Sequence, residues 1–405
     1  MTPSRHEGTL CALLSTDGVS AEGLERTDVE WPQLLALARR ECLKPVLYES
    51  LTHHSERMLV PADVLADLRQ AYYAAAANHL VFTSELQRVL LALADGPGVP
   101  IPSVLLKGAA LSLSLYRKPG LRFMRDADLL IPSGQLEAAR QQLVALGFAE
   151  VAPQLGAAVG RWSCLHLPSL RGGEKANLTV ELHATLVGVE GRRFAPDMEW
   201  FWSQVEPLAP RAMTSFPGLS DSAVQHIYVL KPTANLLYLC AHLALQHGIT
   251  SAPLRWFYDI HLLLTQQRHR VDWEDLVQRA RAFHWEEAVV TALQETRLRF
   301  GTALPDWVLE ALSQRLDSTT AQLVRRRSKP QTDFSAVLAS LALIPRSAQL
   351  QLTVGILFPT PTYVRWRYRP NPAWLWPLYY PYRWFDGVRD AIKTVRAGRR
   401  PLSSG

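Results

Sequence analysis

Cysteine is scarce in this chain, with four residues in 405, and no two of them lie close together. They are Cys11, Cys42, Cys164 and Cys240. The absence of any C-x-x-C pair argues against a disulfide framework or a zinc site and predicts reduced thiols in a cytoplasmic protein. No uninterrupted apolar run reaches about 18 residues, so we expect no membrane-spanning helix. The opening MTPSRHEGTLCALLSTDG has no basic segment followed by an apolar run, which predicts no signal peptide.

Neither sign of charge dominates, because 43 Lys and Arg face 37 Asp and Glu and leave a net charge of +6. This mild basic excess permits an anionic ligand or surface but does not require nucleic acid, and we expect no stable nucleic-acid partner. The apolar fraction of 48% is that of an ordinary globular protein. The length allows two or three domains, and we find no internal repeats.

The pattern of apolar residues predicts an α+β fold with helices at both ends. Residues 1–98 have apolar residues at helical spacing, and the breaker cluster GPGVPIP then marks a boundary. Short strands, helices and turns alternate over residues 99–215, which predicts a small mixed-sheet core. The helical pattern returns over 216–345, and residues 346–405 form an irregular tail rich in aromatic and basic residues.

The tail interleaves arginine with tryptophan and tyrosine between Arg365 and Arg383. Such a mixture could bind a membrane interface or a polyanion. Its prolines, however, argue against a regular amphipathic helix. We therefore expect an extended segment that packs Trp374, Trp376 and Tyr380 onto the body of the protein, without peripheral membrane contact.

Two aspartates stand together in FMRDADLLIPS, residues 123–133. If this segment is a strand, Asp126 and Asp128 point to the same face. The apolar residues that follow are typical of a strand buried on both faces, where two like charges would need a cation between them. Carboxylate oxygens are the preferred ligands of Mg²⁺. The alternative, left open by this motif alone, is that both aspartates lie at a solvated strand end and bind loop amides.

A third carboxylate favours the metal site. In NLTVELHATL, apolar residues alternate with Thr179, Glu181 and His183, so Glu181 belongs to the polar face of a second strand. Carboxylates on two neighbouring strands can hold metal ions against a triphosphate during an in-line displacement. Upstream, Lys107 and Gly108 end an apolar run and open a predicted helix. A glycine there lets backbone N–H groups approach a phosphate, and a helix N-terminus favours anions.

The segment LLKGAALSLSLYRKPGLRFMRDADLLIP, followed by VELHATL, resembles the uncharacterised nucleotidyltransferase family of the polymerase-beta-like nucleotidyltransferase superfamily. The shared pattern is an apolar strand, Lys-Gly, a helix carrying a tyrosine, an arginine before D-x-D, and an acidic residue in an E-x-H-like strand. The wider superfamily usually has Gly-Ser after the first strand, whereas Ala109 follows Gly108 here and supplies no hydroxyl. The resemblance covers roughly residues 28–300, including DVEWPQLLALARRECLKPVLYESL and AHLALQHGITSAPLRWFYDIHLLL.

This resemblance implies transfer of a nucleotidyl group from a nucleoside triphosphate to an unidentified small molecule, peptide or protein, with Mg²⁺ or Mn²⁺ as cofactor. It implies catalytic and metal-binding roles for Asp126, Asp128 and Glu181. The implied nucleotide contacts are Lys107, Gly108, Tyr116, Arg122 and Arg255. The resemblance also implies that His183 and Asp259 contact and orient the residues that bind metal and nucleotide.

Two other functions compete with this interpretation. A D-x-D glycosyltransferase usually has its long apolar strand before the motif, whereas here the apolar run follows it. A non-catalytic binding or scaffold descendant of the same fold is favoured by the missing serine and disfavoured by the intact acidic triad.

Two further pairs belong to the helical region after residue 216. His242 and His247 lie five residues apart, so on an α-helix they do not share a face, and we interpret them as core or interhelical histidines and not as metal ligands. Arg255 and Asp259 lie four residues apart on a helix that is apolar nearly all round. We interpret them as a structural pair or as a pair facing the nucleotide cleft.

Overall fold

The computed structural model describes residues 4–15, 29–53, 60–153, 167–187, 194–314, 346–386 and 389. The helices before and within the central sheet are α1 (Arg5–Leu14), α2 (Trp31–Arg40), α3 (Lys44–His53), α4 (Ala62–Asp95), α5 (Lys107–Ser114), α6 (Leu136–Ala145), α8 (Met198–Ser203), α9 (Pro210–Met213) and α10 (Asp221–Val224). The later helices are α11 (Pro232–Ala241), the π-helix η4 (His242–His247), α12 (Leu254–Gln267), α13 (Trp273–Ala282), α14 (Glu286–Phe300), α15 (Asp306–Ser313), α18 (Arg346–Leu357) and α19 (Pro361–Tyr368). Short 3₁₀ turns are η2 (Ser133–Gln135), η5 (Arg268–Arg270) and η6 (Ala373–Leu378).

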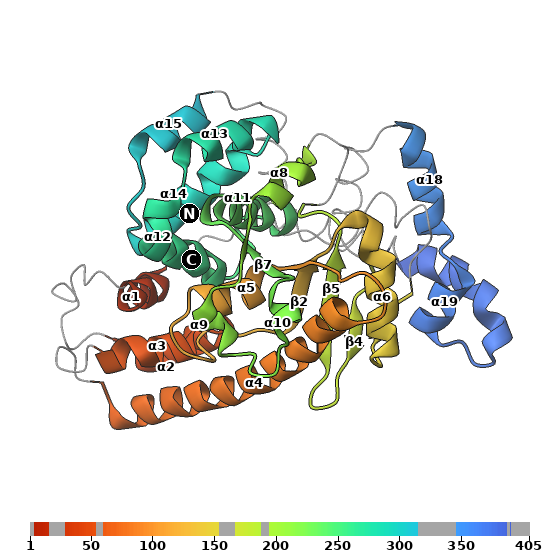
Figure 1. The fold of residues 1–405 in the computed structure, drawn as a ribbon, viewed down its shortest axis with the longest axis horizontal. Coiled ribbons are helices and arrows are strands. Elements are labelled where there is room, and N and C mark those ends of the chain that lie inside the picture. Colours follow the sequence, from red (N-terminus) through yellow and green to blue (C-terminus); the bar gives the residue numbers. More distant parts are fainter. Residues whose placement is uncertain are drawn as a thin grey trace.

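Among the described residues, seven strands form one mixed sheet at the centre of the molecule (Figure 1). They are β1 (Ser103–Leu105), β2 (Asp126–Leu130), β3 (Ala149–Glu150), β4 (Leu170–Gly172), β5 (Leu178–His183), β6 (Val205–Pro207) and β7 (Ile227–Leu230). Their order is β3-β4-β5-β2-β1-β7-β6, with β2 parallel to β5 and β1 parallel to β7. The predicted α+β fold with a small mixed sheet and flanking helices is confirmed. The sheet extends past residue 215, because β7 also belongs to it.

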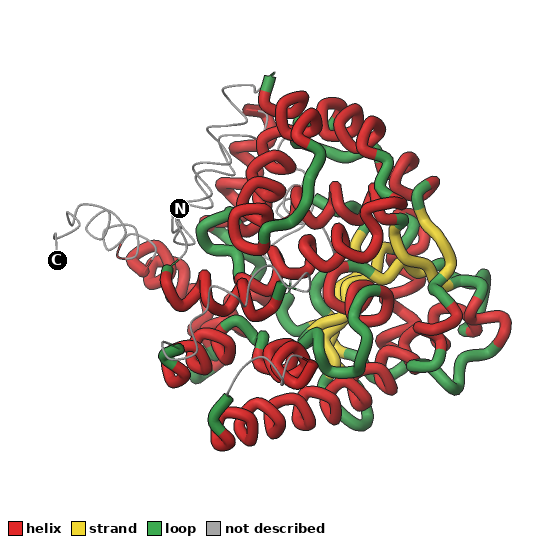
Figure 2. The backbone as a smooth tube through the Cα atoms, turned by 90° about the vertical axis from the view of Figure 1, so that its left-hand side faces the viewer, coloured by secondary structure: helices red, strands yellow, loops and turns green. Residues whose placement is uncertain are grey.

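Alternating side chains of the strands enter two separate cores. Ala127 and Leu129 of β2 pack with residues of α4, α5 and α6, whereas Leu130 packs with α11, α12 and α14. The sheet therefore separates α4, the long helix along the lower edge of Figure 1, from the helical layer that contains α11. Figure 2 shows the strands enclosed by these helices.

The chain between α5 and β2 is fixed against α4 by a glycine. Gly120 has φ +81°, a conformation that side-chain-bearing residues rarely adopt, and a Cβ there would lie 2.4 Å from the backbone nitrogen of Ala76. The turn thus lies directly on the α4 backbone. This contact sets the point from which the chain enters β2 and its two aspartates.

The C-terminal tail differs from the extended segment that its prolines predicted. It forms α18, α19, the turn η6 and a helical stretch over residues 379–386, because the prolines lie between these short elements, in their first turns or within the 3₁₀ turn. The rings of Trp376 and Tyr380 contact each other at 5.8 Å. Trp374 keeps 72% of its surface exposed, so the prediction that it packs onto the body was wrong.

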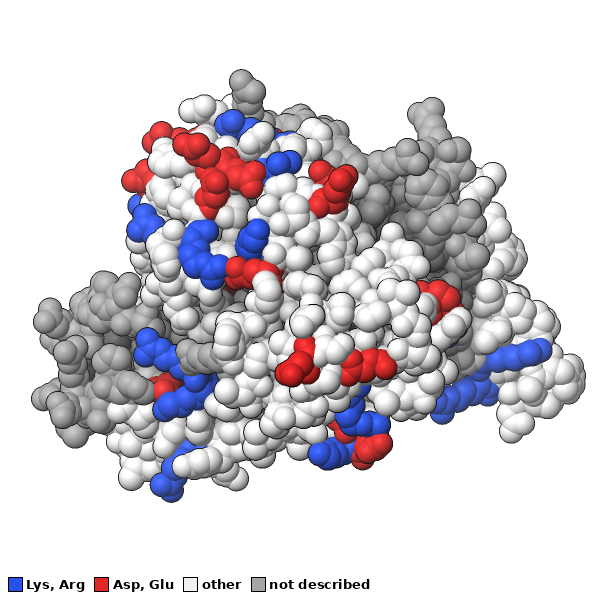
Figure 3. Space-filling model, viewed as in Figure 1, with Lys and Arg blue, Asp and Glu red and all other residues white. Residues whose placement is uncertain are grey.

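Within the described residues, no helix combines the length and the apolar character needed to cross a membrane. On the face shown in Figure 3, the acidic and basic side chains of the described residues form separate small groups of both signs, mainly on the left-hand part and along the lower edge, and much of the rest is uncharged. The predicted strand around WSCLHL and Cys164 falls outside the described residues, apart from Leu167.

Candidate active site

The acidic residues of the two predicted strands come together because β2 and β5 are neighbours in the sheet. The strands run parallel, with Asp128 opposite Glu181 and Leu130 opposite His183. Leu178, Val180 and Leu182 of β5 enter the core beside α4, so the alternating polar positions point to the opposite face. The sequence-based prediction that these carboxylates lie on adjacent strands is confirmed.

Asp128 lies at the centre of this group and is almost fully buried. Its Oδ1 accepts hydrogen bonds from Nζ of Lys107 at 2.7 Å and from Nε2 of His183 at 2.8 Å. The same His183 nitrogen lies 3.6 Å from Oε2 of Glu181. Lys107 has φ 45°, an uncommon backbone conformation for a residue with a side chain. Such strain is often found at functional sites, and here it occurs at the residue whose ammonium group reaches Asp128.

The two aspartates differ in their electrostatics. Burial opposes the ionisation of Asp128, but the Lys107 charge and the His183 hydrogen bond hold its pKa well below the usual range. Asp126, at the exposed start of β2, has its pKa raised by desolvation and by the charges of Asp128 and Glu181. Asp128 therefore stays ionised, whereas the nearby negative charges disfavour the ionised form of Asp126.

The donor atoms of Asp128, Glu181 and His183 all lie within 4.8 Å of one another, close enough to surround one cation. Two carboxylates suit Mg²⁺ or Mn²⁺. The imidazole nitrogen of His183 could either bind Mn²⁺ directly or orient Asp128 by its hydrogen bond. Asp126 lies outside this group, although the sequence predicted it as a ligand. It is His183 that completes the cluster among the residues that the structure describes.

Lys107 and Gly108 lie at the point where β1 gives way to α5. A Cβ added to Gly108 would meet Met124 at 3.7 Å, an ordinary contact, so packing alone does not require a glycine here. Ala109, which stands where the wider superfamily has serine, is 1% exposed within the core beside α4. A hydroxyl at this position would enter an apolar core, which gives a physical reason for the alanine.

Comparison with known protein families gives a match over residues 27–301 to the uncharacterised nucleotidyltransferase family. The chain belongs to this family. The match agrees with the range of about 28–300 expected from the sequence, and it spans all the site residues described so far. No curated protein matches the sequence. No solved structure matches it either.

Two residues implied as nucleotide contacts in this nucleotidyltransferase family member are instead bound to a buried carboxylate. Arg122 places Nε 2.9 Å and Nη2 2.8 Å from the two oxygens of Asp259, and the Tyr116 hydroxyl donates to the same carboxylate at 2.7 Å. Burial and the Asp259 charge raise the pKa of Tyr116 well above its usual value. These contacts join the chain before β2 to α12, so Arg122 and Tyr116 have a structural role that the sequence did not predict.

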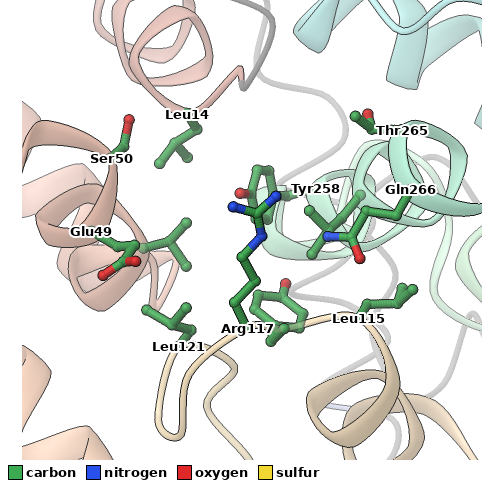
Figure 4. Close-up of a pocket in the computed structure, with 12 residues that line it drawn as sticks. Leu14, Glu49, Ser50, Leu115, Arg117, Leu121, Tyr258, Thr265 and Gln266 are labelled. Atoms are coloured by element: carbon green, nitrogen blue, oxygen red, sulfur yellow. The ribbon is translucent and has the colours of Figure 1, made fainter. Parts of the chain in front are cut away.

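A cavity of about 370 Å³ lies beside this buried network, and the Tyr116 ring forms part of its wall. Figure 4 shows the Arg117 side chain extending between Glu49 of α3 and Gln266 of α12. Asp126, Asp128 and Glu181 are not among the lining residues. The cavity is therefore separate from the carboxylates on the sheet.

Arg255 does not form the predicted pair with Asp259, which is already held by Arg122 and Tyr116. Its Nε is buried without a hydrogen-bond partner among the described residues. Burial and the nearby charge of Arg122 lower the pKa of Arg255. The side chain lines a second, polar cavity of about 360 Å³, next to residues of α1, α2 and the segment that enters α12.

The helical region of this family member contains a feature that the sequence did not predict, the π-helix at His242–His247. The hydrogen bonds of a π-helix join residues five apart, so His242 and His247 lie about one turn apart on the same side, and their ring centroids are 4.6 Å apart. The prediction that they face apart assumed α-helical spacing and was wrong. The five-residue interval between two histidines was the available indication.

The charged groups of the acidic site influence the histidines of the π-helix. Burial, followed by the charge of Lys107, lowers the pKa of His247 to about 4, while the charges of Asp128 and Glu181 act in the opposite direction. One turn earlier, the hydroxyl of Tyr238 is buried next to the Lys107 ammonium group, and burial raises its pKa. Burial alone would lower the pKa of Lys107, but Tyr238 and Asp128 raise it, so this tyrosine and the π-helix border the same site.

Proposed function

We propose that this protein is a metal-dependent nucleotidyltransferase. It transfers the nucleoside monophosphate of a nucleoside triphosphate to a nucleophile on a small molecule, peptide or protein and releases pyrophosphate. The observation that carries this proposal is the pairing of Asp128 with Glu181 on adjacent parallel strands, with Lys107 at 2.7 Å from Asp128. Membership of the nucleotidyltransferase family supports the class of reaction.

Each residue of the site has a proposed role. Asp128 and Glu181 hold a Mg²⁺ or Mn²⁺ ion, and Asp126, at the exposed start of β2 and outside the cluster of Asp128, Glu181 and His183, is the proposed further acidic ligand. A divalent cation there would supply charge stabilisation to the transferring phosphoryl group. Lys107 and the amide of Gly108 bind the triphosphate, since a flexible ammonium and an unobstructed N–H suit phosphate oxygens. His183 orients Asp128 through its hydrogen bond.

The first test is thermal unfolding of the parent and of Asp128→Asn, with Mg²⁺ or Mn²⁺ and each of the four common triphosphates. A ligand that binds the folded state raises the unfolding temperature by mass action. We expect a shift in the parent that requires metal and nucleotide together and disappears in the variant. A parent without such a shift would favour the non-catalytic descendant of the fold.

The second test identifies the group that is transferred. The protein is incubated with a cell extract and a triphosphate labelled at either the α- or the γ-phosphate. Nucleotidyl transfer places only the α-label on the acceptor, because the β- and γ-phosphates leave as pyrophosphate. Recovery of the γ-label on the acceptor would identify a phosphotransferase and would contradict the proposal.

A further inference from the structure

Exposed apolar side chains gather in one part of this protein, the C-terminal segment of residues 346–386. Sixteen large hydrophobic side chains are exposed in the described part of the chain, and ten of them belong to this segment. They are Leu350, Val354, Leu357, Phe358, Trp366, Trp374, Leu378, Tyr382, Trp384 and Phe385. Singly exposed apolar residues are normal, but a concentrated set marks an interaction surface.

Helix α18 contributes a complete apolar face to this surface. Leu350, Val354 and Leu357 are spaced by four and three residues, so they lie along one side of the helix. They are 71%, 49% and 42% exposed, respectively. Figure 1 places α18 and α19 together at one end of the molecule, away from the helical layer around α11. The described protein leaves this face open to solvent.

Contacts inside the segment hold the exposed residues in a defined arrangement. The Tyr380 hydroxyl donates to the carbonyl oxygen of Pro359 at 2.7 Å, and Nε1 of Trp384 donates to that of Leu357 at 2.9 Å. The rings of Phe358 and Trp384 lie 5.3 Å apart, edge to face. The segment is therefore a folded element that presents an apolar surface.

The segment has a net positive charge. From Arg346 to Asp386 the sequence contains five arginines, a single acidic residue at its end, Asp386, and no lysine or glutamate. Two of the arginines lie over aromatic rings, Arg365 over Trp376 and Arg383 over Tyr363, each at 5.5 Å from the ring centroid. In Figure 3, basic side chains lie over the right-hand edge, where Figure 1 places α19.

We propose that residues 346–386 form a peripheral binding surface for anionic membranes. Aliphatic and aromatic side chains would enter the headgroup region, where Trp and Tyr favour the boundary between apolar and polar phases. Arginine side chains would bury their stems along this surface and keep their charge near the lipid phosphates. A nucleic-acid surface would use the cations and ring faces but would leave the aliphatic face of α18 uncovered.

This inference reverses the expectation drawn from the prolines. They do exclude one long amphipathic helix, which is the usual interfacial element. The structure instead builds the surface from α18, α19, the 3₁₀ turn η6 and a helical stretch over residues 379–386, with most of the prolines at or near the boundaries of these elements. The proposal concerns the tail alone and does not depend on the proposed transferase activity.

The test is flotation of the full-length protein with vesicles of phosphatidylcholine, alone or mixed equally with phosphatidylglycerol. We expect recovery with the anionic vesicles and a decrease as salt is raised, since arginine attraction is screened. The combined variant Trp374→Ser, Leu378→Ser and Phe385→Ser removes three apolar side chains that are 72%, 66% and 67% exposed. The partition coefficient of this variant between water and the anionic vesicles should fall by about tenfold or more, because the three serines no longer bury apolar surface in the membrane interface.

The matched control is Tyr73→Ser, Leu80→Ser and Trp307→Ser, which removes side chains 62%, 64% and 46% exposed elsewhere on the surface. It should float like the parent, and both triple variants should keep the parent's unfolding temperature. Equal flotation of the two triple variants would overturn the proposal, as would a parent that ignores anionic vesicles. The same applies if the tail variant converts a dimer to a monomer, or if the tail binds a labelled oligonucleotide in place of lipid.

Discussion

The guanidinium of Arg122 holds both carboxylate oxygens of Asp259, a residue 137 positions later in the chain. The pair is buried, with the two side chains 9% and 2% exposed. It connects the segment that enters β2 with the middle of α12. A guanidinium fork matches a carboxylate in two parallel hydrogen bonds, so the contact fixes direction as well as distance.

Breaking this pair should destabilise the protein strongly. Asp259→Asn leaves the Arg122 charge buried without a counter-charge and replaces the charged acceptor of the Tyr116 hydroxyl by a neutral amide oxygen, and we expect a loss of about 3 kcal/mol in unfolding free energy. Urea unfolding measures the change. The control is Asp275→Asn, which removes a half-exposed partner of Arg279 and should cost less than about 1 kcal/mol. Similar losses of unfolding free energy in the two variants would mean that another group balances the buried charge of Arg122.

The two aspartates of β2 should respond in opposite ways to neutralisation. Asp128→Asn removes the carboxylate that binds Lys107 and His183, so the protein without metal should lose about 3 kcal/mol. Asp126→Asn relieves repulsion from Asp128 and Glu181, and its stability should equal or slightly exceed that of the parent. Thermal unfolding in the presence of a chelator separates them. A marked loss in Asp126→Asn would show that this residue has a structural partner.

Gly108→Ala tests whether the glycine serves a ligand. The new methyl group fits inside the protein, and replacing glycine by alanine in a helix stabilises by about 0.5–1 kcal/mol. If the Gly108 amide approaches a phosphate, the same methyl group should weaken metal-dependent nucleotide binding. Calorimetric titration of one sample gives its nucleotide affinity, and thermal unfolding of the same sample gives its stability. Unchanged nucleotide affinity would remove Gly108 from the site.

Arg255→Gln should leave stability unchanged or raise it, because the guanidinium has no hydrogen-bonded partner at its buried Nε. The comparison is Arg299→Gln, which loses contacts with Glu7 and Glu295 in the same region and should destabilise the protein. Thermal unfolding checks both variants. A loss in Arg255→Gln as large as in Arg299→Gln would indicate an ionic role for Arg255.

Glu85 should make the stability depend on acid pH. Burial opposes its ionisation, but the N–H groups of Lys175 and Glu174 and the charge of Arg88 together lower its pKa below 4.5. Because the folded pKa is lower than the unfolded one, the stabilisation is present above the unfolded value and is lost as pH falls through the folded value. Glu85→Gln should thus differ most from the parent above about pH 5, and the two should converge in acid. Urea unfolding at several pH values measures this, with the exposed Glu137→Gln as a control of small effect.

Local periodicity was sufficient to predict that β2 and β5 are strands and that Glu181 faces the same side as Asp128. It could not predict that His183 joins the cluster while Asp126 remains outside, because this depends on where β2 begins and on the register with β5. The bond from Arg122 to Asp259 has no local indication in the sequence, since it depends on how α12 docks on the sheet. The π-helix was missed because the α-helical period was assumed throughout.

The parallel pairing of β1 with β7 also has a consequence for the order of folding. β1 lies between β2 and β7, yet β7 follows it in the chain only after β2 to β6 have been made. During synthesis the growing chain therefore carries an open strand edge next to the Lys107 segment, and such edges attract other chains. A fragment that ends at residue 215 would keep this edge open permanently. An α/β core expressed as a separate unit must therefore include β7 and the helices that pack against it, together with the first six strands.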